Sequence, residues 1–115
     1  MTTILYVEDH PPAQLLMAAI VADLTPYTLI TALTGAEAEQ LAQEQKPQIY
    51  ILDLDLPDTD GMTLAKRLNA LHGAATIIVS AYAEAIQPDP AYQYLAKPLD
   101  PDYVAQILRH TVTGR

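Results

Sequence analysis

Short apolar runs and longer amphipathic stretches alternate along the whole of this 115-residue chain. Continuous apolar runs such as TILYV at 3–7 and IYILD at 49–53 are typical of strands buried on both faces. Stretches with apolar residues every three or four positions are typical of helices that pack on a sheet. The alternation predicts an α/β fold, with parallel strands and helices on both faces, in a single domain over residues 1–115.

The boundaries of these elements can be predicted from turn and capping residues. Strands are expected at 3–7, 25–32, 49–53, 76–81 and 92–96. Helices are expected from Pro11, after Thr34, over 61–73 and over 100–112. Thr34 and Glu37 form a capping-box pattern, and Gly73 is expected to end the third helix. Between the last two strands only Tyr82 to Gln87 is free to form a helix, because prolines 88 and 90 follow.

Composition excludes several classes of function. The net charge of −8 opposes direct binding to a nucleic-acid backbone, so no direct nucleic-acid contact is expected. The chain has no cysteine, which excludes disulfides and thiolate metal sites. No apolar run approaches the roughly 20 residues that span a membrane, and the first residues lack the pattern of a signal peptide. A cytoplasmic protein without membrane contact is the expectation.

Polar residues stand where the predicted strands end. Glu8 and Asp9 follow the first strand, Asp53 ends the third, Ser80 the fourth, and Lys97 follows the fifth. Ligands of open parallel sheets bind beyond the carboxyl ends of the strands, so these side chains should converge. Carboxylates that share a site raise each other's pKa, and a hard cation such as Mg²⁺ relieves this. A lysine beside them suits a phosphoryl oxygen.

Four segments in this order, ILYVED, ILDLDLPDTDG, VSA and YLAKP, resemble the motif set of the response-regulator receiver domain of two-component phosphorelay signalling. The resemblance runs from about residue 4 to 112, nearly the whole chain. It implies a flavodoxin-like, doubly wound sheet of five parallel strands in the order 2-1-3-4-5. It also implies a Mg²⁺-dependent phosphoprotein that a histidine kinase or a phosphotransfer protein phosphorylates.

The resemblance also implies a set of metal ligands. Asp53 matches the phosphoacceptor, and the carboxylates of Asp9 and Asp53 would bind Mg²⁺ directly. The backbone carbonyl of Asp55 would complete the protein ligands, and Glu8 would act on the metal through water. Among the neighbouring aspartates, Asp58 and Asp60 are expected to serve only the turn and the cap of the following helix.

Three further positions match the family's phosphate-sensing residues. Lys97 would bind a phosphoryl oxygen, and a cis bond is expected before Pro98. Ser80 stands at the position of the switch serine or threonine, and Tyr94 at that of the switch aromatic. The chain departs from the family between Ser80 and Lys97. This segment is several residues shorter than in common receivers and leaves a short or irregular fourth helix.

Three functions are compatible with these features. The leading one is a receiver that switches conformation on phosphorylation and regulates a partner, and that catalyses only its own phosphorylation and dephosphorylation. The second is a receiver-like interaction module that works without phosphate, which the altered segment before Lys97 motivates. The third is a haloacid-dehalogenase-like phosphatase, because DLDLP contains Asp-x-Asp. Those enzymes are longer and carry this motif near the start of the chain.

Overall fold

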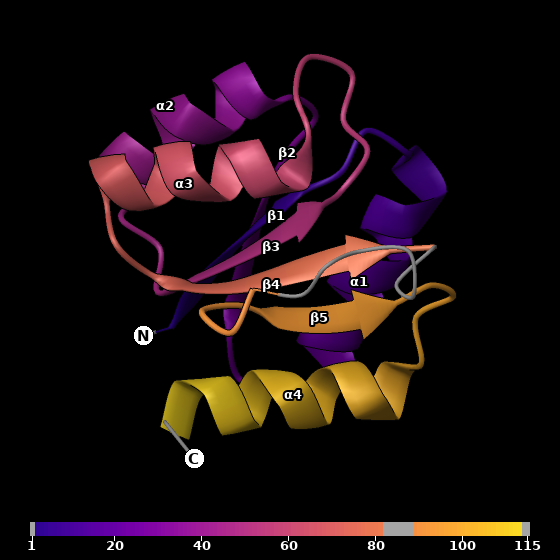
Figure 1. Ribbon diagram of the computed structural model, residues 1–115. Helices are drawn as coiled ribbons and strands as arrows, with labels where there is room; N and C mark the ends of the chain where they lie inside the picture. Colours follow the sequence, from indigo (N-terminus) through magenta and orange to yellow (C-terminus); the bar gives the residue numbers. More distant parts are fainter. Residues whose placement is uncertain (1, 82–88, 114–115) are drawn as a thin grey trace.

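The computed structural model describes residues 2–81 and 89–113, in which five strands form one parallel sheet (Figure 1). The strands are β1 (Thr3–Val7), β2 (Thr28–Ala32), β3 (Ile49–Asp53), β4 (Ala75–Ser80) and β5 (Gln93–Ala96). Their order is β2-β1-β3-β4-β5, as predicted, and all neighbouring pairs are parallel. The connections reverse between β1 and β3, and this reversal brings the ends of these two strands together at one edge.

Helices cover both faces of the sheet (Figure 1). On one face lie α2 (Gly35–Gln45) and α3 (Gly61–Leu71), and on the other lie α1 (Pro11–Leu24) and α4 (Pro101–Thr113). Because side chains alternate along a strand, the core divides into two clusters. Tyr6 packs towards α1 and α4, whereas Leu5 and Tyr50 pack towards α2 and α3. The described helices do not include one long and apolar enough to cross a membrane.

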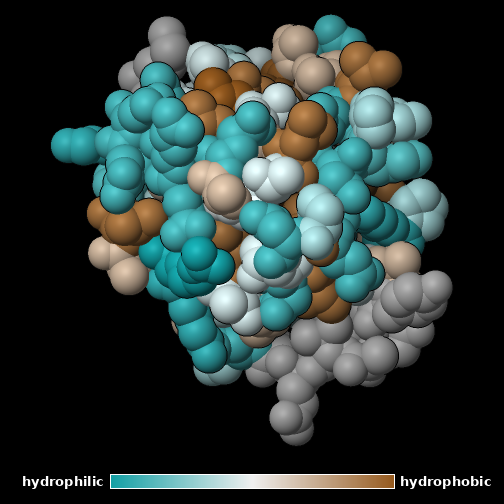
Figure 2. Space-filling model, turned by 90° about the horizontal axis from the view of Figure 1, so that it is seen from above, coloured by the Kyte–Doolittle hydropathy of each residue, from teal (hydrophilic) through white to brown (hydrophobic). Residues whose placement is uncertain are grey.

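The outer surface of the α2–α3 layer is mainly hydrophilic, as Figure 2 shows from above. An ion pair of 2.8 Å between Arg67 of α3 and Glu39 of α2 joins the two helices there. The buried side of α2 consists of small residues, Ala38 and Ala42, which allow the helix to lie close to the sheet. The helix α2 therefore has one apolar side against the sheet and one solvated side.

The end of α3 differs from the prediction that Gly73 stops it. The helix ends at Leu71, its C-cap is His72 in an extended conformation, and Gly73 does not adopt a left-handed φ. The hydroxyl of Tyr50 donates to the carbonyl of His72 at 2.5 Å, close to the last turn. A buried side chain thus supplies a hydrogen bond at this helix end, where a left-handed glycine is more usual.

The start of the second strand and the details of the α2 cap also differ from the sequence patterns. The second strand begins at Thr28 rather than at residue 25, because the N–H and hydroxyl of Thr25 both bond to the carbonyl of Val21 and end α1. The N-cap of α2 is Thr34, as predicted, but the Glu37 carboxylate accepts from the N–H of Leu33. The predicted short helix at 82–87 lies outside the described residues.

Gly61 allows α3 to begin directly against the end of β3. Its N–H donates to the carbonyl of Leu54 at 2.9 Å. A Cβ at this position would lie 2.7 Å from the carbonyl oxygen of Asp53 and 3.0 Å from the Cα of Leu54. Both neighbours are backbone atoms, so no side-chain rotation relieves the clash. The glycine therefore fixes how closely α3 approaches the residue that ends β3.

We expect Gly61→Ala to lower the free energy of unfolding by about 1–3 kcal/mol, as overpacking commonly does. It should also shift the amide NMR signals of Asp53 and Leu54. Gly73→Ala is the matched control, because a Cβ there meets nothing within 4 Å. This control should change stability by less than about 0.5 kcal/mol. Equal stabilities of the two variants in chemical denaturation would contradict the proposed close approach.

Candidate functional site

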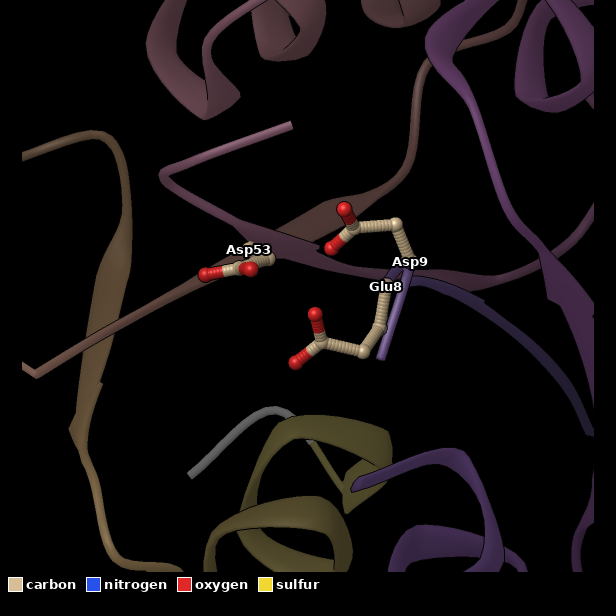
Figure 3. A group of neighbouring side chains, drawn as sticks. All are labelled: Glu8, Asp9 and Asp53. Atoms are coloured by element: carbon tan, nitrogen blue, oxygen red, sulfur yellow. The ribbon is translucent and has the colours of Figure 1, made fainter. Parts of the chain in front are cut away.

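Three carboxylates converge at the carboxyl edge of the sheet (Figure 3). Glu8 and Asp9 follow β1, and Asp53 ends β3, whose Leu52 lies in register with Val7 of β1. One oxygen of each carboxylate lies within 4.8 Å of the others. Glu8 and Asp53 are only 1% and 5% exposed, whereas Asp9 is open to solvent. The group therefore has two buried members and one accessible member.

The backbone around Glu8 is held by hydrogen bonds from two directions. Its N–H donates to the carbonyl of Ala32 at 3.0 Å, which continues the pairing of β1 with β2. Its carbonyl accepts from the side-chain amide of Gln14 on α1 at 2.6 Å. The direction of the chain at the end of β1 is thus set by both a strand and a helix.

Lys97 brings the positive charge to this group. Its Nζ lies 2.9 Å from Glu8 Oε1 and 3.5 Å from Asp53 Oδ1. Its backbone N–H donates to the carbonyl of Ser80 at 3.0 Å, and the following bond to Pro98 is cis, as predicted. The ammonium group therefore approaches the carboxylates from the end of β5 and bridges the two buried ones.

Burial and charge act in opposite directions on Glu8 and Lys97. Burial would raise the pKa of Glu8, but its contacts with Asp53 and Lys97 and the positive charge of Lys97 hold that pKa below its usual value. Burial would lower the pKa of Lys97, and contacts with Glu8 and Asp53 raise it instead. The two side chains stabilise each other's charged forms.

Asp53 has the opposite shift. Burial, followed by the close contact with Glu8 and its negative charge, raises the pKa of Asp53 to about 7. The charge of Lys97 and the N–H of Asp55 oppose this rise without cancelling it. A second full negative charge is therefore unfavourable at Asp53 while no cation is bound.

The donor set fits a hard divalent cation. All three side chains offer carboxylate oxygens, the ligands that Mg²⁺ prefers. Glu8 Oε2 is buried and lacks a hydrogen-bond partner. Among the described residues, no other buried side-chain oxygen or nitrogen atom is unpaired in this way. An unpaired buried carboxylate oxygen is costly, and a metal-bound water or a cation would satisfy it.

The loop between β3 and α3 is fastened by its own aspartates. Asp60 is the N-cap of α3 and accepts from the N–H of Thr63 at 2.8 Å, as predicted. Asp58 does more than complete a turn, because its carboxylate accepts from the N–H groups of Gly35 at 2.8 Å and Ala36 at 3.1 Å. These bonds lower the pKa of Asp58 and cap α2 from a distant loop.

Asp55 lies in the middle of this loop with an exposed side chain. Its N–H bonds to the Asp53 carboxylate, and its backbone pairs with Asp60 in an isolated antiparallel bridge. The backbone of Asp55 is thus placed beside the end of β3, which agrees with a contribution through main-chain atoms. Its role as a carbonyl ligand stays a prediction.

Ser80 and Tyr94 belong to β4 and β5, the two strands next to Lys97. Ser80 ends β4 and is 4% exposed. Tyr94 packs against the core cluster on the α2–α3 face, in register with Ile78. Its hydroxyl oxygen accepts from the N–H of Asp89 at 2.6 Å, in the loop before β5. The structure places both residues near the shortened segment, and their switch roles stay predictions.

Sequence reasoning missed Tyr6. This residue is completely buried in β1, and its hydroxyl donates to Glu8 Oε1 at 3.3 Å. The signal was the spacing of two positions along a strand, which puts Tyr6 and Glu8 on the same face. An aromatic residue in an apolar strand is otherwise simply a core residue.

Comparison with known proteins gives a consistent result. A model of the response regulator receiver domain family matches residues 4–109. The transcriptional regulatory protein KdpE of Mycobacterium tuberculosis is 34% identical over 97% of this chain. A CheY-like receiver domain from Methylobacillus flagellatus superposes with a TM-score of 0.88 at 25% identity, covering 96% of this chain and 98% of that one.

This chain is also similar to a solved structure that contains a metal ion. The receiver domain of a sensor histidine kinase from Pseudomonas aeruginosa has a TM-score of 0.83 at 26% identity, covering 97% of this chain and 98% of that one. That structure holds a magnesium ion in its active-site cleft. The chain spans about half the length of the curated relatives it matches, with 51% of the KdpE protein covered.

The raised pKa of Asp53 leads to a pH-dependent prediction for the metal-free protein. In the unfolded chain this group titrates near 3.9, so the native state binds its proton more tightly. Folding stability should therefore fall as the pH rises from about 4 to about 7. Asp53→Asn removes the charge and should raise the free energy of unfolding at pH 8 by on the order of 1–3 kcal/mol.

Urea denaturation in the presence of a chelator measures this effect. The gain from Asp53→Asn should be smaller at pH 5 than at pH 8. The control is Asp23→Asn, at an exposed position of α1, which should change stability little at either pH. A wild-type protein as stable as Asp53→Asn at pH 8 would show that the burial of Asp53 carries no electrostatic cost.

Proposed function

The chain belongs to the response regulator receiver domain family, and on this basis we propose that Asp53 accepts a phosphoryl group in a Mg²⁺-dependent reaction. The observation that carries the proposal is the meeting of Asp53 with Glu8, Asp9 and Lys97 at one edge of the sheet. A histidine kinase or a phosphotransfer protein is the proposed donor. The role is regulatory, and the only reactions that the chain catalyses are its own phosphorylation and dephosphorylation.

In the proposed reaction a carboxylate oxygen of Asp53 forms a bond to phosphorus while the bond from phosphorus to the donor atom breaks. The product is an acyl phosphate on Asp53, and the donor keeps the electron pair of the broken bond. Asp53 must be ionised to act as the nucleophile, and its pKa near 7 in the metal-free site opposes this. Bound Mg²⁺ supplies the positive charge that favours the ionised carboxylate and the incoming anion.

The surrounding residues have distinct proposed tasks. Asp9 and Asp53 would hold Mg²⁺ through their carboxylates and Asp55 through its backbone carbonyl, with Glu8 acting through water. Lys97 lies 3.5 Å from the Asp53 carboxylate, close enough to pair with a phosphoryl oxygen bound there. The magnesium ion in the active-site cleft of the similar Pseudomonas receiver domain supports a Mg²⁺ site in this fold.

Two residues on the α2–α3 side would report the new charge. Ser80 would donate its hydroxyl to the phosphoryl group, and Tyr94 would change its packing in response. Before phosphorylation, the hydrogen bond that the N–H of Asp89 donates to the Tyr94 hydroxyl would hold the ring in its present position. The downstream partner would then bind one of the two packings.

Intact-mass measurement after incubation with phosphoramidate and Mg²⁺ tests the phosphoacceptor. The wild type should gain one phosphoryl group, and Asp53→Asn should gain none because its amide is not a nucleophile of this kind. Chelation of Mg²⁺ should also prevent the gain. Asp23→Asn serves as the matched control and should be labelled like the wild type. Undiminished labelling of Asp53→Asn would exclude Asp53 as the acceptor.

Lys97→Ala tests the second proposed role. Removing the ammonium should uncouple phosphorylation from conformational change, because the phosphoryl oxygen loses its charged partner. Amide NMR spectra with and without a beryllofluoride adduct should show the full set of shifts in the wild type and in Lys66→Ala, an exposed lysine on α3. In Lys97→Ala the shifts at Ser80 and Tyr94 should be lost. If they persist, Lys97 has another role.

A further inference from the structure

We propose that Tyr6 is a positioning residue of this site, whose buried hydroxyl orients Glu8 towards the bound cation. The proposal rests on the proposed function, since it assumes that Glu8 serves a Mg²⁺ ion. It adds a residue from beneath the site to the strand-end residues described above. The proposed task is to hold the Glu8 carboxylate at one oxygen so that its other oxygen faces the metal.

The two oxygens of Glu8 have different surroundings. Oε1 accepts from Tyr6 Oη at 3.3 Å and from Lys97 Nζ at 2.9 Å. Oε2 is buried and has no hydrogen-bond partner among the described residues. Because both donors hold the same oxygen, rotation of the carboxylate is restricted and Oε2 is left for another ligand. A carboxylate arranged in this way suits a metal-bound water.

Among the residues that the structure describes, Glu8 is the hydrogen-bond partner of the Tyr6 hydroxyl. Tyr6 is completely buried in the core cluster on the α1–α4 face, among apolar side chains. A phenylalanine would fill nearly the same volume without a polar atom. Burying a hydroxyl is costly unless it is hydrogen-bonded, and here its acceptor is Glu8. The hydroxyl therefore belongs to the site rather than to the packing of the core.

Tyr6 also differs from Lys97 in what happens during the proposed reaction. Lys97 bridges Glu8 and Asp53, and it would turn to the phosphoryl oxygen once Asp53 is phosphorylated. Glu8 would then lose its charged partner at Oε1. Tyr6 cannot follow the phosphoryl group, because its ring is fixed in the core. It remains as the donor that keeps Glu8 oriented in both states.

The substitution Tyr6→Phe removes only the hydroxyl, and Tyr50→Phe is a closely matched control. Tyr50 is equally buried, lies on the neighbouring strand β3, and donates to the carbonyl of His72 beside the end of α3. Tyr6→Phe loses the bond to Glu8, and Tyr50→Phe loses the bond to His72 together with a longer one of 3.5 Å to the carbonyl of Leu68. Similar losses of stability are expected for the two, so the difference between them isolates the effect on the site.

The measurement is Mg²⁺ affinity, from amide NMR shifts during titration of the wild-type protein and each variant with MgCl₂. Tyr6→Phe should bind Mg²⁺ about tenfold more weakly, the lower end of the loss expected when a hydrogen bond that orients a metal site from outside the ligands is removed. Tyr50→Phe should stay within about twofold of the wild type. In a Glu8→Gln background, Tyr6→Phe should have little further effect, because the carboxylate that it orients is gone.

Each outcome separates the inference from the proposed function. Equal Mg²⁺ affinities of Tyr6→Phe and Tyr50→Phe would overturn the positioning role, even if Asp53 is phosphorylated normally. An additive loss in the Glu8→Gln background would overturn it as well, because Tyr6 would then act without Glu8. Failure of the wild type to gain a phosphoryl group would overturn the proposed function, whereas the affinity difference would still decide what Tyr6 does for the cation.

Discussion

The repulsion between two buried carboxylates is the constraint on which this structure depends. The strand order puts β1 beside β3, and the strand ends therefore bring Glu8 and Asp53 into one poorly solvated space. Lys97 neutralises part of this charge, and the pKa of Asp53 near 7 shows that the compensation is incomplete. Such a site favours any ligand that adds positive charge. The same edge of the sheet that creates the repulsion thus creates the affinity for a cation.

Different residues hold this edge in place on the two faces of the sheet. On the α1–α4 side, Tyr6 and Lys97 both contact Glu8, and Lys97 also holds the pKa of Glu8 down. On the α2–α3 side, Asp58 ties the loop after β3 to the first turn of α2, while Asp60 starts α3. The loop that follows Asp53 is therefore held by two helices at once. Of the four aspartates between 53 and 60, only Asp53 lies within the carboxylate group.

Much of this arrangement can be predicted from the sequence, because it depends on local patterns. The strands and the cap at Asp60 follow from apolar runs, alternation and capping residues, whereas the strand order was implied by the resemblance to receiver domains. The structure confirms these predictions. The end of α3 could not be predicted locally, since the hydroxyl that donates to the carbonyl of His72 there comes from Tyr50 of β3. Asp58 was missed for the same reason, as its partners at the start of α2 lie 22 and 23 positions away. The roles of the site residues depend on a bound ion and a phosphoryl group, and they stay predictions.

The position of Lys97 links the metal to the phosphoryl group. In the present structure its ammonium is closer to Glu8 than to Asp53, at 2.9 Å against 3.5 Å, so Glu8 is its resting partner. A phosphoryl group on Asp53 must compete with Glu8 for this lysine. A cation that neutralises the charge of Glu8 weakens the ion pair of Glu8 with Lys97. It thereby favours pairing of Lys97 with the phosphoryl oxygen. By thermodynamic linkage, occupation of the phosphoryl site must then favour the cation to the same extent. Under the proposed function, the ion pair of Glu8 with Lys97 is therefore the element through which the two ligands reinforce each other.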